Sequence, residues 1–493
     1  MYSRRALALL ALLALGATVA AFARRVEATR LAMATVPGTS ETSGGEEESL
    51  FAVWRCGTGL PVYTDAGRPP FSATYFNWLF YQTYGAAVRL GAKLSNGACL
   101  PMAGRWLTAA CAALGAAGIA AAAIRLRKDA AHGLAAAALA AFAFCGPLVG
   151  WWAVTVRPDV AALLSEAAGI LLFLLWHRDH PGRATAAALV AFYAAWSFKP
   201  TYLGGLVAVC AFLAAHRRWR DLASLAGGSA ALWLLTFAVG GPLYRASLLD
   251  TATDNPYFFR QGAELLWHAG RISAPFIAGL PWWAAALARH KPWRHRSAAH
   301  DALLLASLGA PIVALLGALA ASKSGAAMNY FFTPNLLLAI GTLCGLWVLE
   351  RGAAAPILAC ALALALSGGT LGGAWGSLSL RSNADTLGRR WAVFSKLPEP
   401  RFADDRRLNL PWLNAHSPPL VYAFKYAGER ARGRAFVNGG IGGMIERGEL
   451  ASLLLPQNTG DSYDQAGLGR YERGGTADGF TVFRLSAARP PSP

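Results

Sequence analysis

The sequence contains 493 residues, carries a formal net charge of +18 and has 15% charged residues and a mean hydropathy of +0.36. Apolar runs of about 15–22 residues recur along its whole length, a pattern typical of membrane-spanning helices and not of an ordinary soluble α/β protein. Its Arg and Lys residues form short clusters between these runs. The charge therefore does not indicate nucleic-acid binding, which favours a basic stripe with interleaved aromatic residues.

The chain begins with a basic and then strongly apolar segment, MYSRRALALLALLALGATVAAFA, over residues 1–23. Such a segment is typical of a cleaved signal peptide or of an uncleaved first helix. Because further apolar runs follow along the whole chain, we expect the uncleaved helix. In either case the chain emerges on the outer side of the membrane.

The apolar runs predict about eleven membrane-spanning helices, and these alternate with polar connections. The predicted spans are 5–23, 105–124, 133–154, 160–176, 184–198, 201–215, 221–243, 272–288, 301–321, 329–350 and 356–374.

Most basic residues fall in the connections on one side of the predicted bundle. These connections are Tyr2–Arg5, Arg125–His132, His177–Arg183, His216–Asp221, Arg289–Asp301 and Glu350–Ala355. The positive-inside rule puts this set in the cytoplasm. The long loop 24–104, the loop 244–271 and the tail from residue 375 then lie outside, which indicates an integral protein of a bacterial inner membrane with an extracytoplasmic C-terminal region.

The first loop contains an ambiguous apolar segment at residues 72–92. Its apolar residues follow one helical face, interrupted by Asn77, Gln82 and Arg89, a pattern that suits a helix in the membrane interface better than a span. Counting it as a span would reverse the side of every later connection. Two cysteines of this loop, Cys56 and Cys99, either form a disulfide or remain two unpaired thiols.

The character of the chain changes near residue 375, where charged residues, Pro, Gly and Asn increase. Short apolar runs predict strands at 392–394, 420–422 and 480–483, and residues 423–432 suit a short helix. We therefore expect an all-α polytopic membrane domain over residues 1–374 and a small extracytoplasmic α/β domain over residues 375–493. No paired halves with interrupted helices, as many transporters have, are found in the sequence.

Charged residues at the outer ends of the spans are the strongest candidates for a functional site. Arg157 and Asp159 lie in the tight connection TVRPD, and Glu166 follows two helical turns deeper on nearly the same face. Lys199 and Lys323 lie in two other outer connections. Ionisable groups at membrane depth usually line a polar cavity, and Arg and Lys there suit a phosphate. The alternatives are an Arg–Asp turn pair, a satisfied buried acid and interfacial snorkelling.

Other polar residues give weaker signals. Asn329 and Tyr330 follow Lys323 closely, and Tyr75 begins the aromatic-rich interfacial segment. Glu264 and His268 form an i,i+4 pair that could bind a metal, but without a third ligand at known spacing a solvated helix face is favoured. No cofactor is predicted, and a divalent metal is possible.

Asp65 is the acid of the first loop, and neighbouring Pro and Gly residues predict a loop rather than a helix around it. A single loop aspartate is usually a turn residue. The aromatic residues that follow suit a sugar ring, a prenyl chain or a plain interfacial belt.

Four segments together resemble the GT-C glycosyltransferases, in particular the bacterial branch similar to dolichyl-phosphate-mannose–protein mannosyltransferases and aminoarabinose transferases. They are VYTDAGRPPFSATYFN in the first loop, VRPDVAALL at the fourth span, FKPTYL between spans five and six, and MNYFFTPNLLLAIG at span ten. The resemblance covers about residues 1–374. Several family members carry an Asp-Glu pair where this loop has Asp65 alone.

The resemblance implies transfer of a sugar, with inversion, from a polyprenyl-phosphate donor to a glycan, lipid or protein hydroxyl at the outer face. Asp65 would then be the general base, and Asp159 would orient Arg157 or contact the sugar. The cations Arg157, Lys199 and Lys323 would stabilise the leaving phosphate. The residues expected to contact substrate are Arg157, Lys199, Lys323, Tyr63, Tyr75, Glu166, Asn329 and Tyr330. The alternatives are a transporter or flippase for a lipid-linked or anionic solute, and a non-catalytic assembly factor.

Overall fold

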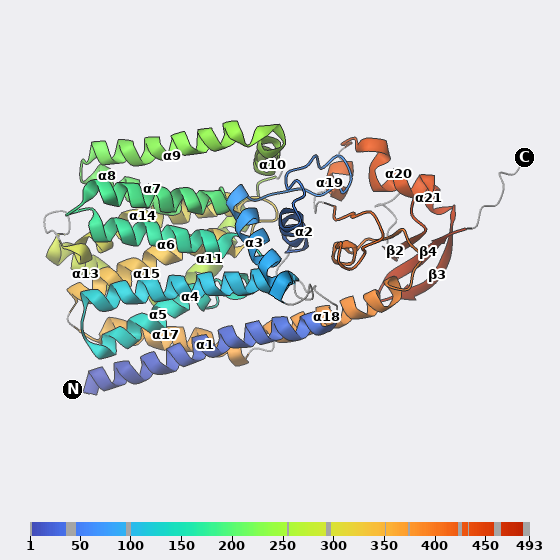
Figure 1. The fold of residues 1–493 in the computed structure, drawn as a ribbon. Coiled ribbons are helices and arrows are strands. Elements are labelled where there is room, and N and C mark those ends of the chain that lie inside the picture. Colours follow the sequence, from blue (N-terminus) through green and yellow to red (C-terminus); the bar gives the residue numbers. More distant parts are fainter. Residues whose placement is uncertain are drawn as a thin grey trace, which may run out of the picture.

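The structure is a computed structural model in which a long helical bundle leads into a small mixed domain (Figure 1). It describes residues 2–35, 46–94, 100–253, 256–291, 297–350, 352–372, 375–422, 426–431, 433–457 and 465–486.

The regular elements described in the bundle and the first loop are helices. Their bounds are α1 Tyr2–Thr35, α2 Glu46–Gly57, α3 Trp78–Leu94, α4 Leu100–Leu126, α5 Ala130–Cys145, η1 Gly150–Val154, α6 Asp159–Trp176, α7 Pro181–Phe198, α8 Gly204–Ala215, α9 Trp219–Val239, α10 Gly241–Thr253, α11 Phe259–Ile272, α12 Ala274–Ile277, α13 Leu280–His290, α14 Ala298–Ala321, η2 Met328–Phe331, α15 Phe332–Ile340, η3 Gly341–Leu346, α16 Trp347–Leu349 and α17 Ala354–Gly372.

The C-terminal region mixes helices and strands. Its elements are α18 Trp375–Phe394, β1 Arg401–Ala403, η4 Arg406–Asn409, α19 Tyr426–Ala431, η5 Val437–Gly439, α20 Gly440–Arg447, β2 Ser452–Pro456, α21 Gln465–Leu468, β3 Tyr471–Ala477 and β4 Phe480–Leu485.

The predicted fold class, a polytopic membrane protein with a C-terminal α/β domain, is confirmed. Within the described residues, seven helices are long and apolar enough to cross a membrane, and two shorter apolar helices are α5 and α8. The seven are Ser3–Leu31, Pro101–Leu126, Asp159–Trp176, Trp219–Val239, Ala298–Ala321, Met328–Leu349 and Ala354–Leu371. The two other predicted spans, 184–198 and 272–288, coincide with α7 and with the two short helices α12 and α13.

The predicted outer connection 244–271 is largely helical. Elements α10 and α11 occupy most of it, and α11 packs along α14. Gly262 permits this packing, since a side chain there would meet Ala318 of α14 and Ser322, which follows α14. Arg260 and Glu264 form an exposed ion pair on α11, as the predicted solvated helix face requires of Glu264. The predicted span 133–154 ends earlier, at Cys145, where Gly146 and Pro147 follow.

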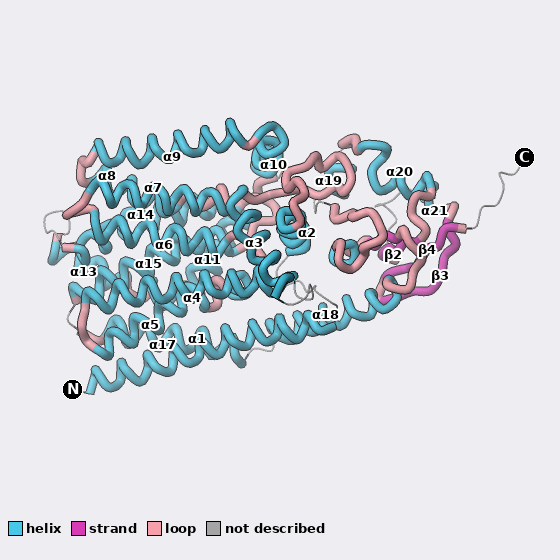
Figure 2. The backbone as a smooth tube through the Cα atoms, viewed as in Figure 1, coloured by secondary structure: helices cyan, strands magenta, loops and turns pink. Residues whose placement is uncertain are grey.

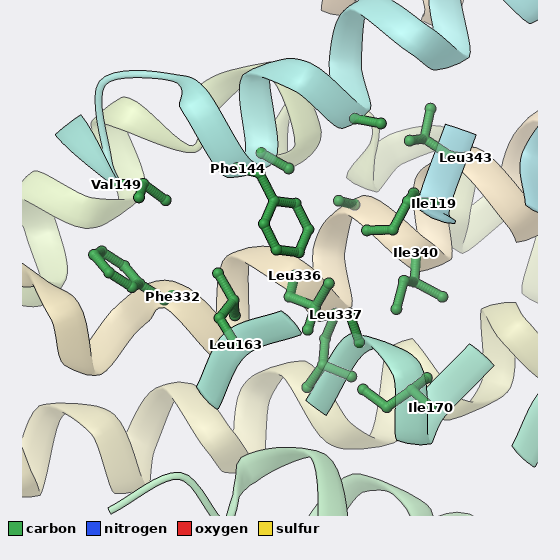
Figure 3. Packing of buried hydrophobic residues seen from close by; sticks show 14 of the residues in the cluster. Ile119, Phe144, Val149, Leu163, Ile170, Phe332, Leu336, Leu337, Ile340 and Leu343 are labelled. Carbon is green, nitrogen blue, oxygen red and sulfur yellow. The ribbon is translucent and has the colours of Figure 1, made fainter. Parts of the chain in front are cut away.

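The core of the bundle is filled by small and aliphatic side chains, and part of it is drawn in Figure 3. Leu163 and Ile170 of α6 face Leu336, Leu337 and Ile340 of α15 there. Because lipid tails are as apolar as such a core, helix association in a bilayer relies on close packing. A Cβ atom at position 115 would lie 2.1 Å from the Phe144 ring, so glycine is what lets α4 approach α5 this closely.

The predicted grouping of the connections is also seen in the structure. Ion pairs join connections predicted to share one side of the membrane: Arg4 with Asp129, Arg178 with Asp301, and Arg289 with Glu350. The connections predicted for the other side lie at the end of the bundle that faces the C-terminal domain, which is called the domain end below (Figure 1).

The C-terminal domain contains a four-stranded sheet of order β1-β2-β4-β3, in which β1 runs parallel to β2 and the other pairs are antiparallel. The strand predicted at 480–483 is confirmed as part of β4. The strands predicted at 392–394 and 420–422 are wrong. Residues 392–394 continue α18, and Val421 lies in an irregular segment that packs against Phe51 of the first loop. The helix predicted at 423–432 corresponds to α19 within its described residues.

The first loop connects the bundle to the C-terminal domain. Phe71 packs against Tyr426 and Phe436, and the Val437 amide donates to the Gly67 carbonyl at 2.9 Å. Figure 2 shows loop segments gathered between the bundle and the strands. On the other flank, α18 lies along α1 and leads into the sheet (Figure 1).

The apolar segment of the first loop forms α3, which is not among the helices apolar and long enough to span a membrane. This finding agrees with the prediction that it is no span. Cys99 lies outside the described residues, as does the predicted domain boundary at residue 374.

Candidate functional site

A cavity of about 320 Å³ opens at the domain end of the bundle. Four connections form its polar wall: the segment before α3, the turn before α6, the α7–α8 connection and the α14–η2 connection. Its lining residues are Tyr75, Phe76, Trp152, Arg157, Lys199, Pro200, Thr201, Leu248, Tyr257, Ala320, Lys323, Ser324, Gly325, Ala326, Ala327, Asn329 and Tyr330. The structure therefore brings together six of the predicted site residues from four separate connections.

Asp159 organises one wall of this cavity, although it is completely buried. Its Oδ1 atom accepts hydrogen bonds from Lys199 Nζ and from Asn329 Nδ2, each at 2.6 Å. The Arg157 Nε atom lies 3.8 Å from Asp159 Oδ2. Charge-assisted hydrogen bonds of this kind hold a buried charge in place, so Asp159 fixes the positions of Lys199 and Asn329.

Aromatic rings surround the two cations that approach Asp159. The Phe76 ring centroid lies 5.6 Å from the Arg157 guanidinium and 5.8 Å from Lys199 Nζ. Lys199 Nζ also lies 5.5 Å from the ring centroid of Tyr330. Cation–π attraction in a partly desolvated site adds to the ion pairing, and it orients the cations without neutralising them.

Three cations gather at the cavity. Arg157, Lys199 and Lys323 line it, and Asp159 lies 3.8 Å from Arg157 and 2.6 Å from Lys199. Such a site suits an anion, and phosphate oxygens are preferred partners of Arg and Lys.

A second, smaller cavity of about 70 Å³ continues from the first, sharing Lys199, Asn329 and Tyr330. Its remaining wall is largely apolar and runs between α8 and the outer half of α14, where Gly317 and Leu316 lie. Neighbouring side chains of α14 are exposed on the surface of the bundle, including Ile312, Leu315 and Leu319. This arrangement offers an apolar path from the cations toward the surrounding lipid.

Glu166 does not line either cavity. It is completely buried, where its Oε1 accepts a hydrogen bond from the Gly205 amide at 2.9 Å and its Oε2 accepts one from the Thr333 hydroxyl. Gly205 is in the first turn of α8, whose amides have no partner within the helix. Glu166 therefore caps α8 from a neighbouring helix, and α8 directly follows the connection that carries Lys199.

Replacing Glu166 by Ala is expected to leave the Gly205 amide and the Thr333 hydroxyl unsatisfied, at a cost of about 1–3 kcal/mol for each buried group. Glu166→Gln keeps an acceptor and should cost less. The midpoint of thermal unfolding in detergent measures the loss of stability in both variants. Glu264→Ala, which removes an exposed ion pair, is the matched control and should change stability by less than about 1 kcal/mol. Equal midpoints for Glu166→Ala and Glu264→Ala would contradict the capping role.

Two predicted aromatic residues occupy different places. Tyr75 lines the cavity, and burial, with Glu48 next in importance, raises the pKa of its hydroxyl well above the usual range, so the hydroxyl stays protonated. Tyr63 lies behind this wall: its hydroxyl donates to the Phe76 carbonyl at 3.1 Å, and its ring packs edge-on against Tyr81. Tyr63 thus supports Phe76 rather than lining the cavity.

Asp65 lies outside the residues that line the cavities. Its side chain is 47% exposed and lies 3.4 Å from Arg68, and its Oδ1 accepts a hydrogen bond from the Gly67 amide at 2.8 Å. A carboxylate that accepts from the amide two residues later forms an Asx turn. In this structure Asp65 shapes the loop that meets the C-terminal domain through Gly67.

Sequence reasoning missed a buried acidic group at the start of α2, formed by Glu46, Glu47 and Glu48. Glu46 pairs with buried Arg105 at 2.9 Å and accepts from the Val156 amide at 2.9 Å, directly beside Arg157. Three consecutive acids in the first turn suit a helix N-terminus, so the sequence could have indicated a helix start here, but not the burial of these acids.

The other two acids of this group meet the C-terminal domain. Arg406 of η4 pairs with Glu47 at 2.6 Å and with Glu48. The Oε2 atom of Glu47 is buried and has no hydrogen-bond partner among the described residues. No group of three or more His, Cys, Asp and Glu side chains that could hold a metal ion is found within the described ranges.

Comparison with known proteins finds solved structures that share this fold. No protein-family model and no curated protein match the chain. Among solved structures, ArnT from Cupriavidus metallidurans in the apo state aligns with a TM-score of 0.58 at 15% identity over 94% of this chain and 97% of that one. The same protein bound to undecaprenyl phosphate aligns with a TM-score of 0.56, at 15% identity, over 96% and 99%.

The oligosaccharyltransferase of Archaeoglobus fulgidus aligns at a TM-score of 0.46 and 13% identity, over 97% of this chain and 75% of that one. The chain thus shares its fold with ArnT, an aminoarabinose transferase of the GT-C type, and the predicted resemblance is confirmed at the level of the fold.

Proposed function

We propose that the protein is an integral-membrane glycosyltransferase that moves a sugar from a polyprenyl-phosphate donor to an acceptor hydroxyl. The observation that carries the proposal is the cluster of Arg157, Lys199 and Lys323 around one paired carboxylate in a cavity that continues into an apolar path. The shared fold with ArnT, one structure of which holds undecaprenyl phosphate, supports the same class of donor.

The charge of the cavity suits the product of the reaction better than the donor. A sugar phosphodiester carries one negative charge, whereas the polyprenyl phosphate that leaves carries about two near neutral pH, as phosphate monoesters do. Arg157, Lys199 and Lys323 line the cavity where this phosphate would lie. They would stabilise the negative charge that grows on the departing phosphate, which is the condition for lowering the barrier.

The lipid part of the donor fits the smaller cavity. Gly317 and Ala320 keep the passage between α8 and α14 open, and Leu316 both lines it and is 46% exposed on the bundle surface. An isoprenoid chain in this passage would pass from the phosphate site directly to the lipid that surrounds a membrane protein. Lys199 borders both cavities, where the phosphate would lie.

An acceptor hydroxyl needs a general base, and a carboxylate of the first loop is the proposed one. Asp65, the candidate from the sequence, is exposed in a turn. Glu47 is buried beside the domain interface and keeps one oxygen without a hydrogen-bond partner among the described residues. Glu46 uses both oxygens on Arg105. Neither Asp65 nor Glu47 is among the residues that line the two cavities, and burial and the available oxygen favour Glu47 as the base.

The reaction is proposed for the outer face of a bacterial inner membrane. The connections rich in Arg and Lys are grouped at the end opposite the domain, so the positive-inside rule directs that end to the cytoplasm. The inverting course, the acceptor class (glycan, lipid or protein) and an extracytoplasmic C-terminal domain that contacts the acceptor belong to the same proposal.

The experiment compares glycolipid, polysaccharide and glycoprotein profiles of a deletion strain complemented with wild type, Glu47→Gln, Glu48→Gln or Asp65→Asn. Loss of a general base typically lowers the rate by about 10²–10⁴-fold, so Glu47→Gln should abolish the glycan product, whereas Asp65→Asn should restore it. Glu48→Gln is the matched control, because it removes the other Arg406 partner. If Glu47→Gln restores the glycan product and Asp65→Asn does not, the general base is Asp65 and not Glu47.

A further inference from the structure

A buried asparagine, Asn77, lies next to the wall of the larger cavity, directly after the lining residue Phe76. Asn77 is completely buried, and both polar atoms of its side chain have partners. Its Nδ2 atom donates to the Trp196 carbonyl at 3.0 Å, and its Oδ1 atom accepts from the Tyr244 hydroxyl at 2.6 Å. A buried amide is costly unless its donor and acceptor are satisfied, so Asn77 and its partners fix one another.

The first partner of Asn77 is the C-terminal end of α7. The last carbonyls of a helix have no partner within it, and Pro200 has no amide hydrogen that could reach the Trp196 carbonyl. Asn77 satisfies two of these carbonyls, because its backbone amide also donates to the Phe198 carbonyl at 3.4 Å. Lys199 is the cap residue of α7. Asn77 therefore fixes the helix end from which the Lys199 side chain enters the cavity.

The second partner of Asn77 is α10, which carries Tyr244. Leu248 lies four residues later, on the same face of α10, and lines the larger cavity. The Tyr244 ring also packs edge-on against Tyr63 of the first loop, with 5.0 Å between the ring centroids. The hydrogen bond from Tyr244 to Asn77 therefore positions α10, and with it Leu248, against the first loop.

The third link is covalent, because Phe76 directly precedes this asparagine. The Phe76 ring centroid lies 5.6 Å from the Arg157 guanidinium and 5.8 Å from Lys199 Nζ. Its backbone is fixed on both sides: the amide donates to the Tyr81 hydroxyl at 3.1 Å, and the carbonyl accepts from the Tyr63 hydroxyl at 3.1 Å. The ring that contacts both cations is thus carried by a well-anchored segment.

We infer that Asn77 is a positioning residue of the phosphate site, an inference that rests on the function proposed above. Asn77 does not contact the substrate. It joins the first loop, the end of α7 and α10, so that Lys199 and the Phe76 ring keep the spacing that a phosphate among the cations requires. Charges held in place in advance stabilise an anion without rearrangement, and a displacement of about 1 Å is enough to lose much of this effect.

The test measures the binding of two labelled lipids to the full-length protein in nanodiscs: polyprenyl phosphate, and uncharged polyprenol with the same chain. The ratio of the two affinities reports how well the cations meet the phosphate, because the lipid chain is common to both. Asn77→Ala should lower this ratio about tenfold, since charge-assisted hydrogen bonds depend steeply on alignment. Tyr244→Phe removes one hydroxyl and should lower the ratio about threefold. The affinity for polyprenol should change by less than about twofold in both variants.

Tyr193→Phe is the matched control. The Tyr193 hydroxyl also shares a hydrogen bond of 2.6 Å, with the Thr236 hydroxyl, and it connects α7 to α9. This variant should leave the ratio unchanged.

An unchanged ratio in Tyr244→Phe, or an equal loss of affinity for both lipids in Asn77→Ala, would overturn the inference. If Asn77→Ala does not fold, Tyr244→Phe decides, because it keeps the aromatic ring and its packing. A wild-type protein that binds polyprenyl phosphate no better than polyprenol would instead overturn the proposed function. The two failures are thus distinguished within one experiment.

Discussion

Replacing Arg157 by Gln is expected to lower kcat for sugar transfer by about 10²–10³-fold, the usual effect of removing one group that stabilises transition-state charge. Arg157 lines the cavity, lies against the Phe76 ring and is only loosely paired with Asp159, at 3.8 Å. Its side chain is therefore placed to follow charge that develops on the leaving phosphate. Steady-state assays of the purified protein measure the change.

The matched control for this variant is Arg260→Gln. Arg260 is 91% exposed on α11 and pairs only with exposed Glu264, so its loss should leave both kcat and the unfolding midpoint nearly unchanged. Equal activity of the Arg157 and Arg260 variants would remove Arg157 from the catalytic site. If Arg157→Gln lowers both the unfolding midpoint and the activity, Arg157 has a structural role instead.

Replacing Lys199 by Met is expected to abolish transfer and to destabilise the protein by about 3–5 kcal/mol, because breaking a buried ion pair leaves one charge uncompensated. Lys199 is 7% exposed and its partner Asp159 is completely buried. The Nζ–Oδ1 distance of 2.6 Å indicates a direct hydrogen bond. The free energy of unfolding and the transfer rate are measured on the same preparations.

The double variant Lys199→Met/Asp159→Asn separates the two effects. It removes both charges, so much of the lost stability should return, while the phosphate still lacks one cation and transfer stays low. Restored stability together with restored activity would show that Lys199 only neutralises Asp159. A double variant as unstable as Lys199→Met alone would contradict the ion pair as the source of stability.

Much of the membrane domain could be predicted because a bilayer imposes a strong pattern on sequence. Spans need long apolar runs, and basic residues gather on one side, so the helices and the grouping of their ends follow from composition. The packing of α11 within segment 244–271 could not be predicted, because this helix contacts the bundle through small residues such as Gly262 and Ala269 while its exposed face carries Arg260 and Glu264.

The candidate site could be predicted in part. Arg157, Lys199 and Lys323 are cations in connections where the positive-inside rule disfavours them, and the structure places all three in one cavity. Glu166 was expected to contact substrate, whereas in the structure it lies outside the two cavities and its two hydrogen bonds cap α8. The spacing of seven residues predicts that Asp159 and Glu166 lie on nearly the same face of α6. It does not predict which neighbouring helix that face packs against.

The buried acids at the start of α2 could not be recognised without tertiary contacts. Three consecutive glutamates suggest an exposed helix start, and only the pairing of Glu46 with Arg105 and of Glu47 with Arg406 shows that they are buried. Arg406 comes from the C-terminal domain, more than three hundred residues later in the chain. Long-range ion pairs of this kind leave no local signal in a single sequence.

The central claim is that the cavity holds a polyprenyl phosphate and transfers its sugar. The most direct measurement incubates the purified protein in nanodiscs with a polyprenyl-phosphate sugar, labelled in both the sugar and the lipid, and with an extract of the cell envelope as acceptor. Wild type should release labelled polyprenyl phosphate and move the labelled sugar to an acceptor at equal rates, while Arg157→Gln should do neither at a comparable rate. Movement of the intact donor across the bilayer without cleavage would contradict the claim and indicate a flippase.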